Sequence, residues 1–399
     1  MKTGATAIDT PRASSLRIAL AAGEASGDAL GAGLIEALRK RSPQAQFFGI
    51  AGPGMIAAGC EPWYRTEELS VMGLAEVLRH LPRLLRLRRQ FIGRLRVARP
   101  DVFIGIDSPD FNLPVEAALK KFGVPTVQYV SPQVWAWRQS RVAGIRGAAD
   151  LVLCLLPFEP EFYQTHDVNS VFVGHPLADQ VPLEVDASEA RRSLGLPAAT
   201  PILAVLPGSR SAEVSRLARP FLETGKWLQQ RRPGLCVVVA LANDALRDRY
   251  LQATGGIELD PPARLVVGRA REVMAASDVV LTASGTASLE ATLLKRPMVV
   301  AYIISRLTHR LLRVLGLNKL EHFSLPNLLA GRELVPEYLQ AQVCPAVMGP
   351  ALERYLGHCG ESEDWRDAFS AIHQQLRRGA SDGAAEAVLS LLSEEAHGR

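Results

Sequence analysis

Several features that mark common classes of protein are absent from this 399-residue sequence. No apolar run reaches the roughly 18 residues of a membrane-spanning helix, and residues 1–15 lack the apolar segment of a signal peptide. The five cysteines are odd in number and widely scattered, without the close CxxC spacing of a metal or redox site. We therefore expect a cytoplasmic chain in a reducing compartment, with a disordered tail at residues 1–15.

Familiar phosphate-binding signatures are missing as well. The sequence holds neither an Asp-x-Asp pair nor a Walker GxxxxGK, so it does not signal a metal-clamped diphosphate or NTP hydrolysis. The glycines near the start stand at positions 23, 27, 31 and 33, which does not match the GxGxxG of dinucleotide-binding folds. We expect no metal and no cofactor.

What the sequence does contain is an alternation of short apolar runs and helical patterns. Hydrophobic residues make up 48% and charged residues 22%, an ordinary composition for a soluble protein, and the length suggests two domains. The alternation predicts an α/β protein with two parallel, doubly wound sheets. We expect domains at 16–182 and 190–343, followed by C-terminal helices at 344–399. Strands are expected at 16–21, 47–50, 101–106, 126–130, 151–156, 171–173, 202–206, 236–240, 265–267, 279–281 and 298–301.

A candidate phosphate site lies at 278–302, DVVLTASGTASLEATLLKRPMVVAY. A strand is followed by a turn of Ser284, Gly285 and Thr286, and a helix begins at Ala287. The unpaired N–H groups and positive dipole of such a helix start favour an anion. Glu290, one turn on, could accept hydrogen bonds from a ribose. The alternative is that the hydroxyls only cap the helix and Glu290 is solvated.

A second loop of the same half has a similar composition. PGSR follows the expected strand 202–206, where Gly208 and Ser209 can turn backbone N–H groups toward an anion. Arg210 can add a positively charged guanidinium, which binds phosphate oxygens in pairs.

Two acids of the first half stand where expected strands end. Glu24 follows the first strand, and Asp107 ends the strand at 101–106. The carboxyl edge of a parallel sheet is the usual place for ligands, and an acid there can serve as a general base. A solvated loop acid is the other interpretation of Glu24.

The segment Leu69–Arg99 combines an apolar helical spacing with dense basic charge, opposed nearby only by Glu76. Such a helix favours an anionic membrane surface. Nucleic acid is a weaker interpretation, because the arginines are not interleaved with aromatic residues; a core helix with a solvated basic face is the third. The arginines are Arg79, Arg83, Arg86, Arg88, Arg89, Arg94, Arg96 and Arg99.

A set of motifs along almost the whole chain resembles the lipid-A-disaccharide synthase family. They are GEASGD (23–28), LSVMGLAEVL (69–78), IDSPDFN (106–112), YVSPQVWAWR (129–138), LPFEPEFY (156–163), FVGHPLAD (172–179), LPGSR (206–210), ASGTASLE (283–290) and SLPNLLAGRELVPE (324–337). The residues before Leu16 lie outside this pattern.

The resemblance implies a GT-B glycosyltransferase, two Rossmann-like domains with a cleft between them. It implies an inverting transfer from UDP-2,3-diacylglucosamine to 2,3-diacylglucosamine 1-phosphate, giving a β(1→6) disaccharide 1-phosphate and UDP. It also implies peripheral attachment to the inner face of the inner membrane, and a homodimer whose C-terminal helices pack back on an N-terminal domain or are exchanged.

The candidate catalytic residues are then Asp107, Glu24, Arg210 and Asn327, the last within the final motif. Asp107 is preferred to Glu24 as the base. Two other functions fit the architecture: a UDP-sugar epimerase, which needs no acceptor, and a membrane-bound UDP-sugar-binding protein without chemistry.

Overall fold

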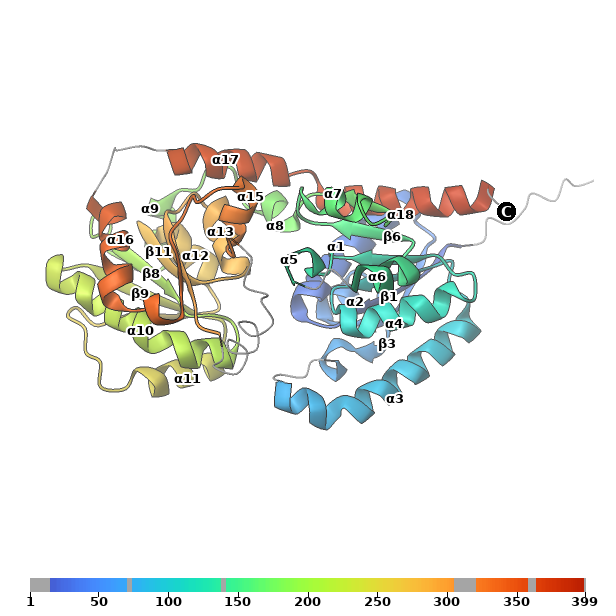
Figure 1. Cartoon of the computed structure of the whole chain (residues 1–399), viewed down its shortest axis with the longest axis horizontal. Coiled ribbons are helices and arrows are strands. Elements are labelled where there is room, and N and C mark those ends of the chain that lie inside the picture. Colours follow the sequence, from blue (N-terminus) through green and yellow to red (C-terminus); the bar gives the residue numbers. More distant parts are fainter. Residues whose placement is uncertain (1–14, 70–73, 138–140, 305–320, 358–363, 398–399) are drawn as a thin grey trace, which may run out of the picture. The chain divides into compact units, whose positions relative to one another are not determined.

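The computed structural model describes residues 15–69, 74–137, 141–304, 321–357 and 364–397. The chain divides into two units. The N-terminal unit comprises the residues up to Gly174 together with those from Gly379 onward, and the C-terminal unit is His175–Arg378. Both are α/β, as the alternation predicts (Figure 1).

The N-terminal unit is built on a parallel sheet with the strand order β3-β2-β1-β4-β5-β6-β7. Its central strands are buried on both faces and read as continuous apolar runs, which is typical of parallel sheets. The strands are β1 (Arg17–Ala22), β2 (Gln46–Ala51), β3 (Cys60–Arg65), β4 (Val102–Ile106), β5 (Thr126–Tyr129), β6 (Leu151–Cys154) and β7 (Ser170–Phe172).

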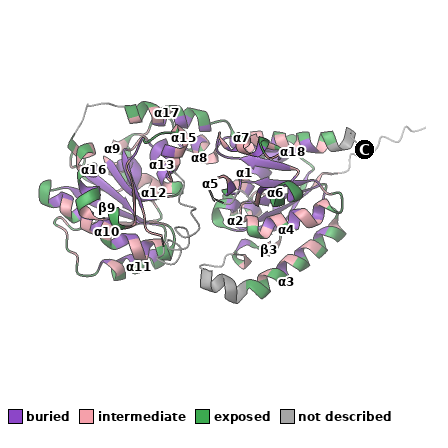
Figure 2. Ribbon diagram, in the orientation of Figure 1, coloured by how far each residue is buried: buried purple, intermediate pink, exposed green. Residues whose placement is uncertain are grey.

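Helices cover both faces of this sheet, and Figure 2 shows their buried sides as purple stripes. The C-terminal helix α18 returns to pack on α1, where Ala384 and Val388 join the core formed around Ile18 and Leu20. Arg41 of α1 pairs with Asp382 at 2.6 Å. The helices are α1 (Ala25–Arg41), α2 (Pro53–Ala57), α3 (Leu74–Ala98), α4 (Pro109–Lys120), α5 (Val134–Trp137), α6 (Val142–Ala148), α7 (Glu159–Gln164) and α18 (Ala380–His397).

The C-terminal unit repeats the arrangement with the parallel order β10-β9-β8-β11-β12-β13. Its strands are β8 (Ile202–Leu206), β9 (Cys236–Leu241), β10 (Arg264–Val267), β11 (Val279–Ala283), β12 (Met298–Tyr302) and β13 (Glu337–Leu339). Its helices are α8 (Pro176–Gln180), α9 (Ala187–Ser193), α10 (Ser211–Arg231), α11 (Asp244–Thr254), α12 (Ala270–Ala276), α13 (Thr286–Leu293), α15 (Leu325–Ala330), α16 (Pro345–Gly357) and α17 (Asp364–Leu376).

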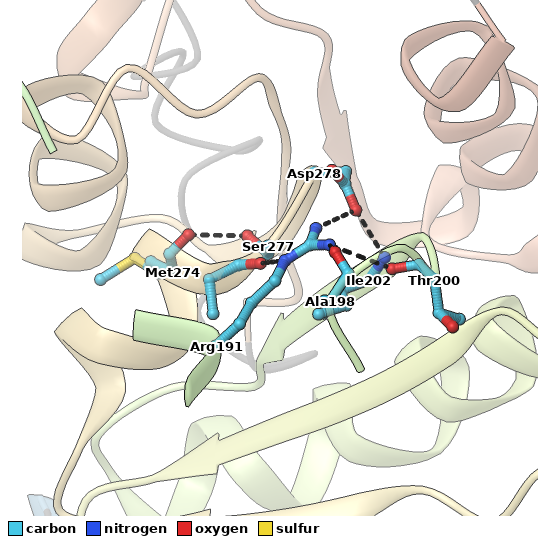
Figure 3. Close-up of polar contacts among 8 residues, drawn as sticks. Arg191, Ala198, Thr200, Ile202, Met274, Ser277 and Asp278 are labelled. Carbon is cyan, nitrogen blue, oxygen red and sulfur yellow. Dashed lines mark hydrogen bonds and ion pairs between the residues drawn. The ribbon is translucent and has the colours of Figure 1, made fainter. Parts of the chain in front are cut away.

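The units meet at residues 174 and 175, not in the expected interval 182–190. Arg191 of α9 attaches a segment after this boundary to the C-terminal unit (Figure 3). Its guanidinium donates to the carbonyls of Ala198 and Ala276 and pairs with Asp278 at 2.8 Å, while Asp278 also accepts from the Ile202 backbone N–H. These bonds attach α9 to the beginnings of β8 and β11, which are neighbours in the C-terminal sheet.

The C-terminal helices are divided between the units. α16 and α17 belong to the C-terminal unit, whereas α18 belongs to the N-terminal unit. The His175 backbone N–H donates to the Leu376 carbonyl, and His373 bonds Ala178, so α8 and α17 are held together. The expected group 344–399 is therefore two structural groups.

Candidate functional site

The predicted site residues gather at the point of each sheet where the strand order reverses. In the N-terminal unit β2 and β3 lie on one side of β1 and β4 lies on the other, so the loops after β1 and β4 diverge. In the C-terminal unit the corresponding strands are β8 and β11. Ligands of doubly wound folds bind at such switch points, outside the carboxyl ends of the strands. Glu24 and Asp107 follow the first pair of strands, and PGSR and Ser284 follow the second.

Asp107 occupies a strained and well-supported position directly after β4. Its φ is +53°, a left-handed conformation that is uncommon for any residue except glycine. Its N–H donates to the Tyr129 carbonyl at 2.8 Å, and its own carbonyl accepts from Asn112 Nδ2 at 2.9 Å and Gln128 Nε2 at 3.2 Å. The backbone that carries this carboxylate is thus bonded on both sides.

Glu24 lies in the adjoining loop and is held less firmly. It is exposed and precedes α1 without a side-chain capping bond. The two loops are in close contact, because a Cβ placed on Gly23 would lie 2.1 Å from Ser108 Oγ. The absence of a side chain at Gly23 lets the loops of the two predicted acids approach each other.

Asp28, the last residue of GEASGD, is a structural member of this edge that the sequence interpretation did not assign. Its buried carboxylate accepts from the backbone N–H groups of Gly52, Gly54 and Met55 at 2.7–3.0 Å. A Cβ on Gly52 would lie 2.6 Å from that carboxyl carbon. The sequence signal for this contact is the AGPG turn at 51–54, because Gly52 and Gly54 let the backbone come close to the Asp28 carboxylate.

The segment after β6 contains a further unassigned acid, Glu159 of α7. It is buried, and it accepts from Trp135 Nε1 at 3.2 Å and the Leu156 N–H at 3.0 Å. Burial raises its pKa to about 7, against the lowering effect of these hydrogen bonds. Trp135 therefore packs and donates a bond here, while the side chain of Trp137 lies outside the described atoms.

In the C-terminal unit, Glu213 determines the geometry of PGSR. Its carboxylate accepts from the backbone N–H groups of Ser209 at 3.1 Å and Arg210 at 3.2 Å, and Tyr302 donates to it at 3.4 Å. Gly208, with φ +120°, has no room for a Cβ beside Glu213. We expected the Ser209 N–H to point toward an anion, but it donates to the Glu213 carboxylate of the protein itself. The Arg210 side chain is 72% exposed, so the loop presents its guanidinium to solvent.

The helix start after β11 has the expected geometry. Gly285, at φ +147°, precedes α13, and Thr286 is its first residue. The first N–H groups of a helix have no partner within it, and both residues are exposed. Ser284 Oγ donates to the Phe323 carbonyl at 3.2 Å, which joins this loop to the segment before α15.

Glu290 is paired within the protein. It lies on α13, half-buried, with Oε1 3.3 Å from Arg271 Nη2. Burial raises its pKa, and Arg271 opposes that shift. Arg271 belongs to α12, and no local pattern in the sequence connects it with Glu290.

Asn327 has a structural role that the sequence did not indicate. Its side chain is fully buried, donates to the Val335 carbonyl at 2.9 Å, and accepts from the N–H groups of Leu334 and Val335 at 2.7 and 3.0 Å. An amide bonded to the backbone in this way shapes the turn that leads into β13. Asn327 therefore has a structural role, and its catalytic role stays a prediction.

The helix α3 covers part of Leu69–Arg99 and has two different faces. Leu87, Phe91 and Leu95 are buried in the core, as the core-helix interpretation predicts. Leu81 and Val97 are 42% and 86% exposed, among exposed arginines that include Arg83, Arg86 and Arg89. Residues 70–73, and the side chains of 74–80, lie outside what the structure describes. None of the described helices is long and apolar enough to cross a bilayer.

Two doubly wound units in one chain, with acids at the switch edge of one and a helix start and arginine at that of the other, define the GT-B architecture. Solved structures share this fold. The glycosyltransferase of kitacinnamycin aligns at a TM-score of 0.61 and 18% identity, over 95% of this chain and 99% of its own. The UDP-GlcNAc 2-epimerase from Neisseria meningitidis bound to UDP-GlcNAc aligns at 0.63 and 11%, over 94% and 100%.

Sequence comparison identifies the family. The family model for lipid-A-disaccharide synthetase matches residues 18–388. A lipid-A-disaccharide synthase of Xanthomonas campestris is 51% identical over 95% of this chain and 86% of its own length, and one of Xylella fastidiosa is 49% identical over 95% and 98%. The chain belongs to the lipid-A-disaccharide synthase family, and it is a glycosyltransferase of lipid A biosynthesis. The resemblance seen in the motifs is confirmed, and the epimerase and non-catalytic alternatives are set aside.

Proposed function

We propose that the chain transfers 2,3-diacylglucosamine from UDP to the 6-hydroxyl of 2,3-diacylglucosamine 1-phosphate. The products are the β(1→6) disaccharide 1-phosphate and UDP, and the anomeric configuration is inverted. The position of Asp107 carries this proposal: it is an acid at the switch point of the N-terminal sheet, on a backbone bonded from both sides. Family membership supports lipid A precursors as the substrates.

Asp107 acts as the general base in this proposal. Inversion requires a group that takes the proton of the attacking hydroxyl as the oxygen closes on the anomeric carbon. A base works best on a rigid platform, and the carbonyl of Asp107 is bonded to two buried amides. Glu24 is exposed in the adjoining loop and orients the acceptor.

The C-terminal unit holds UDP. The start of α13 at Ser284–Ala287 and the exposed guanidinium of Arg210 stabilise the leaving diphosphate, because both present positive charge at one sheet edge. Glu290 bonds the ribose, with Arg271 orienting it. Glu213 keeps Gly208, Ser209 and Arg210 in their turn. No metal is required in this proposal, and turnover should be unchanged in excess EDTA.

The exposed part of α3 binds the inner face of the inner membrane. It combines outward apolar residues such as Leu81 with exposed arginines, the composition that anionic lipid surfaces attract. We also propose a homodimer, which sedimentation of the purified protein at several concentrations would test.

One assay tests the reaction. Purified protein is supplied with UDP-2,3-diacylglucosamine, and UDP release is measured with 2,3-diacylglucosamine 1-phosphate, with unacylated glucosamine 1-phosphate, and without acceptor. We expect release only with the acylated acceptor, together with a β-linked disaccharide by NMR. Equal release in all three mixtures would contradict the proposed transfer.

A further inference from the structure

Three buried polar side chains converge on one glycine beneath Asp107. Asn112 and Glu116 are four residues apart on α4 and therefore lie on the same face of the helix. A Cβ on Gly105 of β4 would lie 2.3 Å from Glu116 Oε1 and 2.7 Å from Asn112 Cβ, so both side chains use the space that this glycine leaves. Gln128 of β5 is the register partner of Gly105 and projects from the same face of the sheet.

These side chains are fully enclosed, with exposures of 1% for Asn112 and 0% for Glu116 and Gln128. The side-chain N–H groups of Asn112 and Gln128 are hydrogen-bonded. Asn112 Nδ2 donates to the carbonyls of Ala21, Ile106 and Asp107, and Gln128 Nε2 donates to those of Asp107 and Val130. The amides therefore tie together the carboxyl ends of β1, β4 and β5.

The oxygens of the same side chains are not matched with donors. Among the described residues, no hydrogen-bond donor reaches Asn112 Oδ1, Gln128 Oε1 or either oxygen of Glu116. Buried polar atoms are normally paired, and an ionised carboxylate can only accept. A neutral Glu116 carries an O–H and turns one of these acceptors into a donor. Burial is the main reason that its pKa rises to about 8; Asp150 adds to the shift and Lys120 opposes it.

The cluster supports two residues with unusual backbone conformations. Asp107 has φ +53°, and Val130 has φ +80°, which is an outlier for a β-branched residue. Both carbonyls accept from Gln128 Nε2. Strained conformations of this kind persist only where the surroundings hold them, and they gather at functional sites.

We infer that Glu116, Asn112 and Gln128 form a buried scaffold that sets the conformation of Asp107, which makes Glu116 a positioning residue for the transfer reaction. Glu116 donates its O–H to a neighbouring amide oxygen and fixes the orientation of the amides, and the amides hold the Asp107 carbonyl. The inference rests on the proposed role of Asp107 as the base.

Two variants of similar volume separate the scaffold from simple packing. Glu116→Gln keeps a donor and an acceptor and should leave kcat within about twofold of the parent. Glu116→Met removes the donor and should lower kcat by about 10- to 100-fold, a typical loss when a catalytic group is misplaced. The KM for the UDP-sugar and the affinity for UDP should stay unchanged, because both belong to the C-terminal unit.

A matched control addresses stability. Thr126 is also buried and donates to the Ala148 carbonyl, but it stands at the opposite end of β5. Thr126→Val should lower the melting temperature and leave kcat unchanged. If Glu116→Met gives no folded protein, Gln128→Met carries the same test.

The deciding measurement is a double-mutant cycle with Asp107→Asn. If Glu116 acts through Asp107, Glu116→Met should cause no further loss of kcat in the Asp107→Asn background. Equal losses in both backgrounds, or an unchanged kcat in Glu116→Met alone, would overturn the inference. Full activity of Asp107→Asn itself would instead overturn the proposed function, so the two failures are distinguishable.

Discussion

The two units use similar doubly wound scaffolds but support the backbone at Asp107 and at Arg210 with different chemistry. In the N-terminal unit, buried amides donate to backbone carbonyls, and the loops present the carboxylates of Glu24 and Asp107. In the C-terminal unit, carboxylates accept from backbone N–H groups: Glu213 holds Ser209, and Glu337 holds the Ser324 N–H at 2.7 Å. That edge presents a helix start and Arg210. Similar folds therefore present carboxylates at the edge of one sheet and an arginine with a helix start at the edge of the other.

The largest loss of turnover should come from replacing Asp107. Asp107→Asn should lower turnover by roughly 10²–10⁴, the usual loss for a general base, with UDP affinity unchanged. Initial rates and UDP titration by calorimetry measure both. Asp110→Asn, in the exposed ion pair with Arg141, is the matched control and should be nearly silent. If Asp107→Asn keeps most of its turnover while Glu24→Gln abolishes it, the two roles must be exchanged.

A second prediction compares the arginines of α3 with arginines of the C-terminal unit in binding to anionic membranes. Replacing Arg83, Arg86 and Arg89 of α3 by Ser should weaken binding to anionic vesicles by about 3 kcal/mol, at roughly 1 kcal/mol per basic residue. Co-sedimentation with vesicles measures the change. Replacing Arg219, Arg231 and Arg247 in the C-terminal unit alters the net charge equally and should have little effect. Equal losses in the two variants would show that only net charge matters.

UDP affinity should depend on Glu290 in the C-terminal unit and not on Asp107 in the N-terminal unit. Glu290→Ala should weaken UDP binding by roughly 1–3 kcal/mol, the range for hydrogen bonds to a charged group. The exposed neighbour Glu272→Ala serves as the control in the same calorimetric titration. Unchanged UDP affinity in Glu290→Ala would remove this residue from the ribose site.

The pH dependence of stability provides a separate test of the buried acids of the N-terminal unit. The folded-state pKa values of Glu116 and Glu159 are raised by burial to about 8 and about 7, from an ordinary 4.5. The folded protein therefore favours their neutral forms. Their contribution is complete below about pH 4.5 and is lost as the pH rises through 7 and 8, at up to about 1.4 kcal/mol per pH unit for each group.

Urea unfolding of the parent, measured from pH 5 to 8, should show this decline in stability. Glu116→Gln should make this decline shallower, because Glu159 still contributes, and Glu36→Gln, at an exposed position of α1, should leave it unchanged. A slope that is the same in all three proteins would mean that Glu116 is not neutral in the folded state.

Most strands of the two sheets could be predicted from the sequence, because buried parallel strands are continuous apolar runs. Two strands, β3 and β13, could not. The first contains Glu61 and Pro62 and is largely exposed, and the second is only three residues long and half-buried. Neither has the composition of a buried strand. The domain boundary was placed too late because His373 bonds the Ala178 carbonyl across 195 residues of the chain, which no local pattern shows.

The candidate residues were found where strand ends could be read locally, as for Glu24, Asp107 and Arg210. The residues that support them could not be found in that way. Glu290 and Arg271 are 19 residues apart, and Gln128 reaches Asp107 across 21. The backbone bonds of Asn327 could not be predicted, because an asparagine in a loop motif looks the same whether it binds a substrate or the backbone.

The return of α18 to the N-terminal unit has a consequence for how the protein folds during synthesis. A growing chain exposes the whole C-terminal unit before Ala384, Ala385 and Val388 become available to the core around β1. The first unit to leave the ribosome is thus the last to be completed. Until then the apolar side of α1 lacks its cover, and a newly made chain carries an exposed hydrophobic surface that chaperones bind and that favours aggregation.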